Sequence, residues 1–206
     1  MPEDKKDVVI DTDFFRKVTN NLSTNELFLK IMDEMGLSPV MHEYIFKEEL
    51  HKDSFVTKLR DSGVLKVYSF EQYLNSGNTE EFEEKFMEAY KKFNFQPFKG
   101  DNIRTYRKSE ESLGEIHSSL MAWYMNMDIM MSDDGEAKHY VTTMLNSRQR
   151  KIHVYNIYDT LEYIGKMPER SIKWKEIKGM ANQAFERAPK KFDSIREIWV
   201  ERNTLE

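Results

Sequence analysis

Acidic side chains follow two predicted strands at the point where each strand ends. Asp11 comes directly after the apolar run 8–10, and Asp133 and Asp134 follow the run 129–131. Because functional sites in an open α/β sheet form at the carboxyl ends of the strands, we expect Asp133 to face Asp11 there. Carboxylate oxygens are hard ligands suited to Mg²⁺ or Mn²⁺. The pattern therefore predicts a divalent-cation site held by carboxylates.

Two further acidic positions are candidates for the same site. Glu115 stands at the start of a predicted helix that leads into the second of these strands, and Glu48 and Glu49 end a short element that begins at Pro39. The acid contributed by that element is Glu48, Glu49 or Glu43. Carboxylates held close together repel one another, so a cluster of them indicates a bound cation. Each Asp that follows a strand also suits a helix N-cap, and both interpretations stay open.

The apolar residues that must position these acids alternate between strand-like and helix-like spacing. A Ser23-x-x-Glu26 capping box precedes a helix that Gly36 ends. Such alternation predicts an α/β domain with a central, mostly parallel sheet, in which the strands ending at Ile10 and Met131 are neighbours. The predicted strands span residues 8–10, 64–68, 128–131 and 152–155, and further predicted helices span 114–127, 136–145 and 160–164.

Residues 1–165 are expected to form this domain, with a helical insertion at about 51–112. Within the insertion, Phe82, Phe86 and Phe93 recur at helical spacing in a segment at about 75–100, and a polar loop follows at 101–112. A stripe of this kind normally faces a core. We therefore expect these rings to pack inside the protein or against a subunit, and not to stack on bases.

Residues 166–206 form a basic C-terminal extension that is expected to pack on the domain or flank it. Its part 166–191 holds eight Lys or Arg and three Glu. Lys173, Lys175 and Lys178 lie next to Trp174 and are candidates for binding nucleic-acid phosphates. A solvated amphipathic helix explains the same charges, because charge runs are usually solvated.

Composition excludes several other classes of protein. The chain of 206 residues has a formal charge of −5, and its 13% aromatic content favours a packed core over disorder. It contains no cysteine, so disulfides, thiolate metal sites and a cysteine nucleophile are excluded. Neither a Walker A loop nor a G-x-S-x-G elbow occurs. With no signal peptide and no apolar run of about 20 residues, we expect a cytoplasmic protein.

The order of these motifs resembles that of PIN-domain nucleases. The pattern begins with a strand that ends in an Asp, followed by a segment of proline and apolar residues that ends in acids. Next come an acid at the start of a helix and a strand that ends in paired Asp. A last strand with a polar tip completes the pattern. The segments concerned are Val8-Val-Ile-Asp11-Thr-Asp13, Pro39 to Leu50, Leu113-Gly-Glu115, Asp128 to Lys138 and Ile152 to Asn156.

This resemblance implies a three-layer PIN-like fold and metal-dependent cleavage of RNA phosphodiester bonds. One or two Mg²⁺ or Mn²⁺ ions would generate a hydroxide from bound water and stabilise charge on the phosphate. The implied metal ligands are Asp11, Glu48, Glu115, Asp133 and Asp134, and the first four of these are the implied catalytic residues. Toxin members of the family pair with an antitoxin, so a toxin with an antitoxin-like protein partner is one expectation, and a homodimer is another.

Two alternatives stand beside the ribonuclease hypothesis. A PIN-like module that binds nucleic acid without turnover would not need a cation that bridges at least three of the acids. An interaction protein would dock a partner through its insertion and tail, and an apolar face left exposed on residues 79–93 would favour that function.

Overall fold

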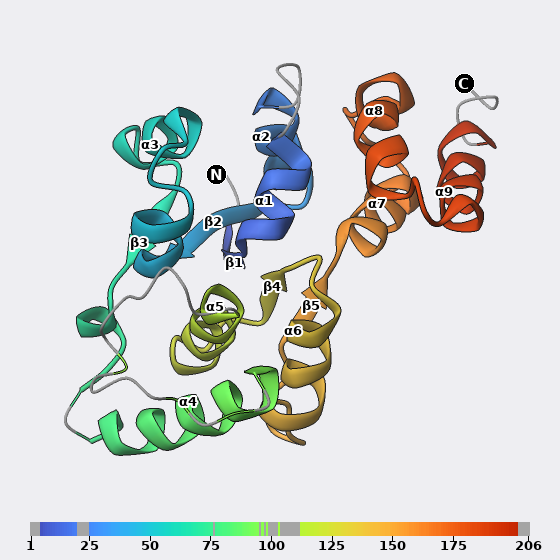
Figure 1. Ribbon diagram of the computed structural model, residues 1–206. Helices are drawn as coiled ribbons and strands as arrows, with labels where there is room; N and C mark the ends of the chain where they lie inside the picture. Colours follow the sequence, from blue (N-terminus) through green and yellow to red (C-terminus); the bar gives the residue numbers. More distant parts are fainter. Residues whose placement is uncertain are drawn as a thin grey trace.

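A five-stranded sheet forms the centre of the computed structural model, which describes residues 5–19, 25–75, 77–94, 96, 98, 103 and 112–201. The strand order is β3-β2-β1-β4-β5, and every pair of neighbours is parallel (Figure 1). The strands are β1 (Lys6–Ile10), β2 (Leu37–His42), β3 (Lys66–Tyr68), β4 (Ile129–Met131) and β5 (His153–Tyr155). The predicted α/β fold with a parallel sheet is confirmed.

The pairing of β1 with β4 sets the geometry of the carboxyl edge. Ile10 pairs with Met131, so the two strands predicted to be parallel neighbours are so. Val8, Val9 and Ile10 have no exposed surface, and neither do Met130 and Met131. Strands of a parallel sheet are covered on both faces, and for this reason these runs are apolar without alternation.

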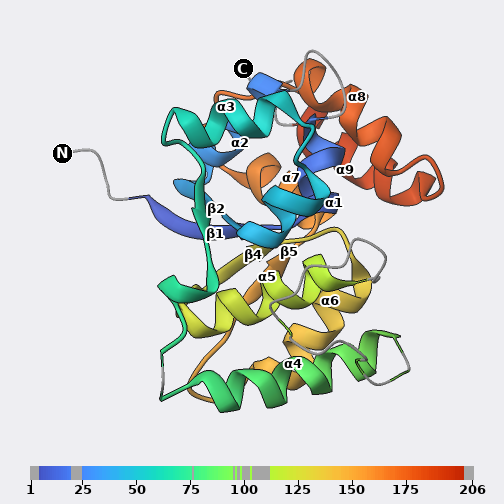
Figure 2. The ribbon, with the colours of Figure 1, turned by 60° about the vertical axis from the view of Figure 1, so that its left-hand side comes forward.

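Helices cover both faces of the sheet (Figure 2). On one face, α5 (Leu113–Tyr124) packs against β1, β2 and β4, and α4 (Thr79–Asn94) packs against α5. The other face carries α1 (Thr12–Thr19), α2 (Asn25–Glu34) and α7 (Ile157–Lys166). Shorter elements complete the domain: η1 (Ile45–Glu49), α3 (Ser54–Asp61), η2 (Phe70–Gln72), α6 (Gly135–Tyr140) and η3 (Val141–Leu145).

The aromatic stripe of the insertion belongs to the core. Phe82 and Phe86 are fully buried, and Phe93 is 8% exposed. The Phe82 and Phe86 rings stack with their centroids 6.3 Å apart, and Phe86 also lies 5.3 Å from the ring of His117 on α5. The predicted core packing is confirmed. Most of the predicted loop 101–112 and the Ser23 cap lie outside the described residues.

The segment from Pro39 to Leu50 is not the single short element that the sequence predicted. It contains most of β2, and η1 follows as a π-helical turn. Proline normally interrupts a central strand because it lacks an N–H group. The Lys6 N–H donates to the Gly36 carbonyl at 3.0 Å, and in the register that this bond sets the Pro39 nitrogen faces away from β1. On the side that the nitrogen does face, β3 begins only opposite Val40, one residue further along β2. The proline therefore removes no hydrogen bond from the sheet.

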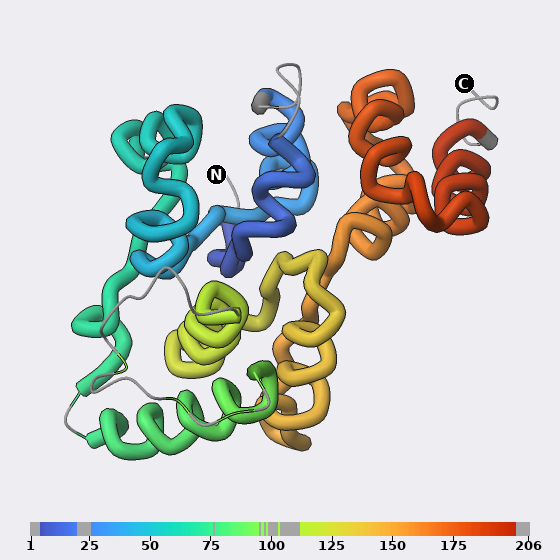
Figure 3. The backbone as a smooth tube through the Cα atoms, viewed as in Figure 1, coloured from blue at the N-terminus to red at the C-terminus, as the bar shows by residue number. Residues whose placement is uncertain are grey.

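The C-terminal extension consists of α8 (Trp174–Ala184) and α9 (Pro189–Glu201), which lie beside α7 (Figure 3). Trp199 is fully buried, and its Nε1 donates to the Leu161 carbonyl at 2.9 Å. Gly165 admits this ring, since a Cβ there would lie 2.6 Å from Nε1 of Trp199. Across to α2, the Ser171 backbone N–H donates to the Glu34 carboxylate at 2.9 Å. The extension thus packs on the domain at several points.

None of the helices in the described part of the chain is both long enough and apolar enough to span a lipid bilayer.

Candidate active site

Asp11 lies at the junction of β1 and α1 and is fully buried. Its backbone N–H donates to the Met131 carbonyl at 2.9 Å, and its Oδ2 accepts from the Ser132 hydroxyl at 2.8 Å. Within the described residues its Oδ1 has no hydrogen-bond partner. Buried carboxylate oxygens normally have a partner, so this oxygen is available to a water or to an ion.

Ser132, and not Asp133, faces Asp11 across the strand ends. The parallel register places the residue after Met131 beside the residue after Ile10, and side chains of consecutive residues point in different directions. Asp133 turns instead to Lys17, with an Nζ to Oδ2 distance of 2.5 Å. Its Oδ1 accepts from the Ile157 backbone N–H at 3.0 Å, at the start of α7. The expectation that Asp133 faces Asp11 was therefore wrong.

Of the three acids after β2, Glu49 rather than the predicted Glu48 is the one whose charge acts on Asp11 and Glu115. The hydroxyl of Thr12, at the start of α1, donates to the Glu49 carboxylate, and the guanidinium of Arg16 donates to the Glu49 carbonyl at 2.8 Å. The carboxylate also lies against Gly114 at the start of α5. The π-helical turn of η1 carries Glu49 to this position, and such turns often occur at functional sites.

Glu115 joins Asp11 and Glu49 from the first turn of α5. Burial raises the pKa of Asp11 well above its ordinary value, and the nearby Glu115 and Glu49 raise it further. Burial also raises the pKa of Glu49. The pKa of Glu115 is raised to about 7, mainly by burial and then by the charges of Glu49, Asp134 and Asp13. Such perturbed acids are typical of functional sites.

Asp134 combines a capping role with a place at the rim of the cluster. It is the N-cap of α6, and its Oδ1 accepts from the Ala137 N–H at 2.8 Å. Its charge also acts on Glu115. The capping role of Asp134 is therefore shown, and its role as a metal ligand stays a prediction.

The chemistry of this acidic cluster, defined as Asp11, Glu49, Glu115 and Asp134, suits a hard divalent cation. Asp11 has a buried oxygen to offer. A cation would stabilise the charged forms of Asp11, Glu49 and Glu115, whose pKa values are raised first by burial and then by neighbouring acids. In their present orientations no three His, Asp or Glu side chains of the described residues converge closely enough to hold a metal ion.

Sequence reasoning missed three residues that shape this site: Thr12, Asp13 and Ser132. Asp13 raises the pKa of both Glu49 and Glu115 by its charge. Ser132 follows the last residue of β4 directly, as Asp11 follows the last residue of β1, and Thr12 comes one residue later. Considering every polar residue just after a predicted strand would have found them.

The three predicted nucleic-acid-binding lysines lie on the C-terminal extension and not at the acidic cluster. Lys173 is the N-cap of α8, and Lys175 and Lys178 are exposed on that helix.

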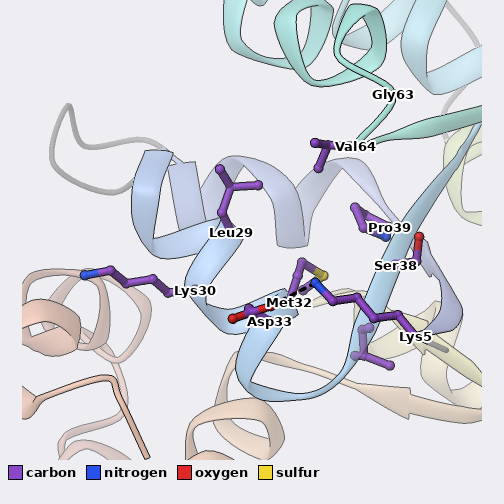
Figure 4. Close-up of a pocket in the computed structure, with 10 residues that line it drawn as sticks. Lys5, Leu29, Lys30, Met32, Asp33, Ser38, Pro39, Gly63 and Val64 are labelled. Carbon is purple, nitrogen blue, oxygen red and sulfur yellow. Dashed lines mark hydrogen bonds and ion pairs between the residues drawn. The ribbon is translucent and has the colours of Figure 1, made fainter. Parts of the chain in front are cut away.

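A pocket of about 460 Å³ lies at the amino ends of β1, β2 and β3, opposite the carboxyl ends where the acidic cluster lies (Figure 4). Leu29 of α2, Pro39 of β2 and Val64 line it, and an ion pair of 2.9 Å joins Lys5 to Asp33, which also line it. It contains no candidate site residue. In an open parallel sheet the carboxyl edge is the usual place for ligands, and the acidic cluster occupies that edge.

A scan against protein-family models, a search of curated proteins and a search of solved structures each found no match for this chain.

Proposed function

We propose that the protein is a divalent-cation-dependent nuclease that hydrolyses RNA phosphodiester bonds and has a PIN-like fold. The observation that carries this proposal is the orphaned Oδ1 of the fully buried Asp11, beside two further carboxyls with raised pKa values. The all-parallel sheet and the chain order of the acids support it. RNA as the substrate follows from the resemblance to PIN-domain nucleases alone.

Asp11, Glu49 and Glu115 would hold the cation, and Asp134 would assist from the rim. When bound, the cation supplies an acidic water as nucleophile and stabilises charge on the phosphate. Ser132 and Thr12 hold the Asp11 and Glu49 carboxylates in place through their hydroxyls. The pKa of Glu115 is raised to about 7, so near neutral pH this residue would hold a proton in part of the cation-free protein, and it would have to lose that proton to act as a ligand.

Cleavage of single-stranded RNA in Mn²⁺, compared with cleavage of DNA of the same sequence, tests this function. We expect Asp11→Asn and Glu115→Gln to abolish cleavage. Glu43→Gln is the matched control, because Glu43 pairs with Lys47 at 2.5 Å and is not among the charges that raise the pKa of Asp11 or Glu115. RNA cleavage that survives both cluster substitutions would contradict the proposal.

A catalytically inactive nucleic-acid-binding or protein-interaction module with the same fold is the alternative. A melting experiment distinguishes the two functions. The nuclease is stabilised by Mn²⁺ relative to EDTA, and this stabilisation disappears in Asp11→Asn, whereas the inactive module shows no difference. The apolar face of residues 79–93 is buried and gives a protein-docking function no support.

A further inference from the structure

The outer side of β5 borders a second pocket, which has a volume of about 500 Å³. β5 is the last strand of the sheet, and no strand of the described residues pairs with its outer side. The strand forms the floor of the pocket, α6 and η3 form one wall, and α7 forms the other. Figure 1 shows α6 and α7 on either side of β5.

One backbone N–H and one backbone C=O of β5 point into this pocket. The His153 N–H donates to the Asp128 carbonyl at 2.8 Å, and the Tyr155 carbonyl accepts from the Ser132 N–H at 3.1 Å. Residues 153 and 155 therefore turn their backbone groups toward β4. Because successive residues of a strand alternate, the N–H and C=O of Val154 point away from β4, to the side where Val154 lines the pocket.

The protein already pairs a planar amide with this same edge. The Ile152 N–H donates to Oδ1 of Asn146 at 2.8 Å, and Nδ2 of Asn146 donates to the Ile152 carbonyl at 3.1 Å. Ile152 precedes Val154 by two residues, so both present their backbone groups on the same side. A ligand with an adjacent donor and acceptor can pair with Val154 in the same way.

The side chains of the pocket favour a flat, uncharged ligand. Tyr163 is 45% exposed, and its ring meets that of Tyr155 edge to face at a centroid distance of 6.0 Å. The charged groups of the walls are mutually paired. Lys138 lies 2.6 Å from Asp159, and Lys166 lies 2.8 Å from Glu162. These four side chains carry no net charge, so together they favour an uncharged ligand over a phosphate.

We propose that this pocket binds a nucleobase, which stacks on Tyr163 and pairs with the backbone of Val154. The proposal rests on the proposed nuclease function, because it makes the pocket a subsite for one base of the RNA. Every base has an adjacent donor and acceptor on its Watson–Crick edge, and base–aromatic stacking tolerates all sequences. Asp134 of the acidic cluster begins α6, and Lys138 follows it by one helical turn, so the pocket adjoins the cluster.

The test is an NMR titration of the full-length, ¹⁵N-labelled protein in EDTA with the four nucleoside monophosphates, following the Val154 amide. We expect a saturable shift of that resonance, and about tenfold weaker binding in Tyr163→Leu, since stacking contributes about 1–3 kcal/mol per base. Tyr68→Leu, on the opposite edge strand β3, is the matched control and should bind as the wild type does.

A Val154 resonance that does not move with any nucleotide would overturn the proposal, as would equal affinity in Tyr163→Leu and Tyr68→Leu. A Val154 shift caused by an extended blocked peptide but not by nucleotides would also overturn it, in favour of strand addition. Asp11→Asn separates the two proposals. RNA cleavage by this variant tests the nuclease proposal, and its nucleotide binding in EDTA tests the pocket proposal. One proposal can therefore be contradicted while the other is supported.

Discussion

Gly114 and Glu49 lie so close together that a Cβ on Gly114 would stand 2.5 Å from Oε1 of Glu49. The backbone of Gly114 lacks the positive φ that favours glycine, so its requirement is for space. The absent side chain allows the carboxylate from η1 to reach the first turn of α5, next to Glu115.

Gly114→Ala should displace the Glu49 carboxylate and leave the fold intact. The group in the way is the end of a flexible side chain, and alanine is favoured in a helix by up to about 1 kcal/mol. We expect unchanged or higher stability in urea and a reduction of cleavage by up to about a hundredfold, because misplaced site groups are costly.

Gly179→Ala is the control for that substitution. Gly179 lies within α8, and a Cβ there would meet no described atom within 4 Å. We expect an increase of up to about 1 kcal/mol in the free energy of unfolding and unchanged cleavage. Equal cleavage in the two variants would separate Glu49 from the site.

Asp11→Asn should reduce Mn²⁺-dependent cleavage by more than about a hundredfold, because cation catalysis contributes several kcal/mol. In EDTA its melting temperature should stay the same or rise, since a neutral amide replaces a carboxyl whose charged form is disfavoured by burial and by two nearby acids. Calorimetry in EDTA and in Mn²⁺, beside the cleavage assay, measures both effects.

Asp133→Asn should behave differently. Asparagine retains an acceptor for the Ile157 N–H, and the substitution removes only the partly exposed ion pair with Lys17. Such pairs contribute about 0–1 kcal/mol, so we expect small changes in stability and near-normal cleavage. Cleavage abolished by Asp133→Asn would return this residue to the ligand set.

Without a cation, stability should fall as the pH rises from about 4.5 to about 7. The Glu115 carboxyl has its pKa raised from 4.5 to about 7 in the folded protein, so within that window the folded state holds more protons than the unfolded state does. The free energy of unfolding then decreases with pH. Urea unfolding in EDTA should show a smaller decrease for Glu115→Gln than for wild type, and identical pH profiles would contradict the burial of this charge.

Neutralising Lys173, Lys175 and Lys178 together should weaken binding to single-stranded RNA and flatten its salt dependence. All three are exposed on or next to α8. The slope of log affinity against log salt should change by about 0.7 for each RNA phosphate that a lysine no longer neutralises. Filter binding at several salt concentrations in EDTA measures this slope, and an unaltered value would assign the lysines to a solvated helix.

Much of the architecture was already predictable from local patterns. Val8–Ile10 and the run ending at Met131 are apolar without alternation because both faces of a parallel sheet are covered, and the stripe Phe82–Phe93 has the spacing of a helix that faces a core. β2 was missed because Pro39 normally argues against a central strand. Proline is tolerated at that position because its nitrogen faces away from β1 and because β3 pairs with β2 only from Val40 onward.

The sequence by itself placed Asp11, Asp133 and Asp134 at the carboxyl ends of the strands, because an acid just after a parallel strand lies there. The tertiary structure alone decided which of them meet. Whether Glu48 or Glu49 reaches Gly114 depends on the winding of η1. Whether Ser132 or Asp133 faces Asp11 depends on the β1–β4 register, since a shift of one residue turns a side chain the other way. Spacing in the sequence places residues along one element, whereas contacts between elements are set by packing and register.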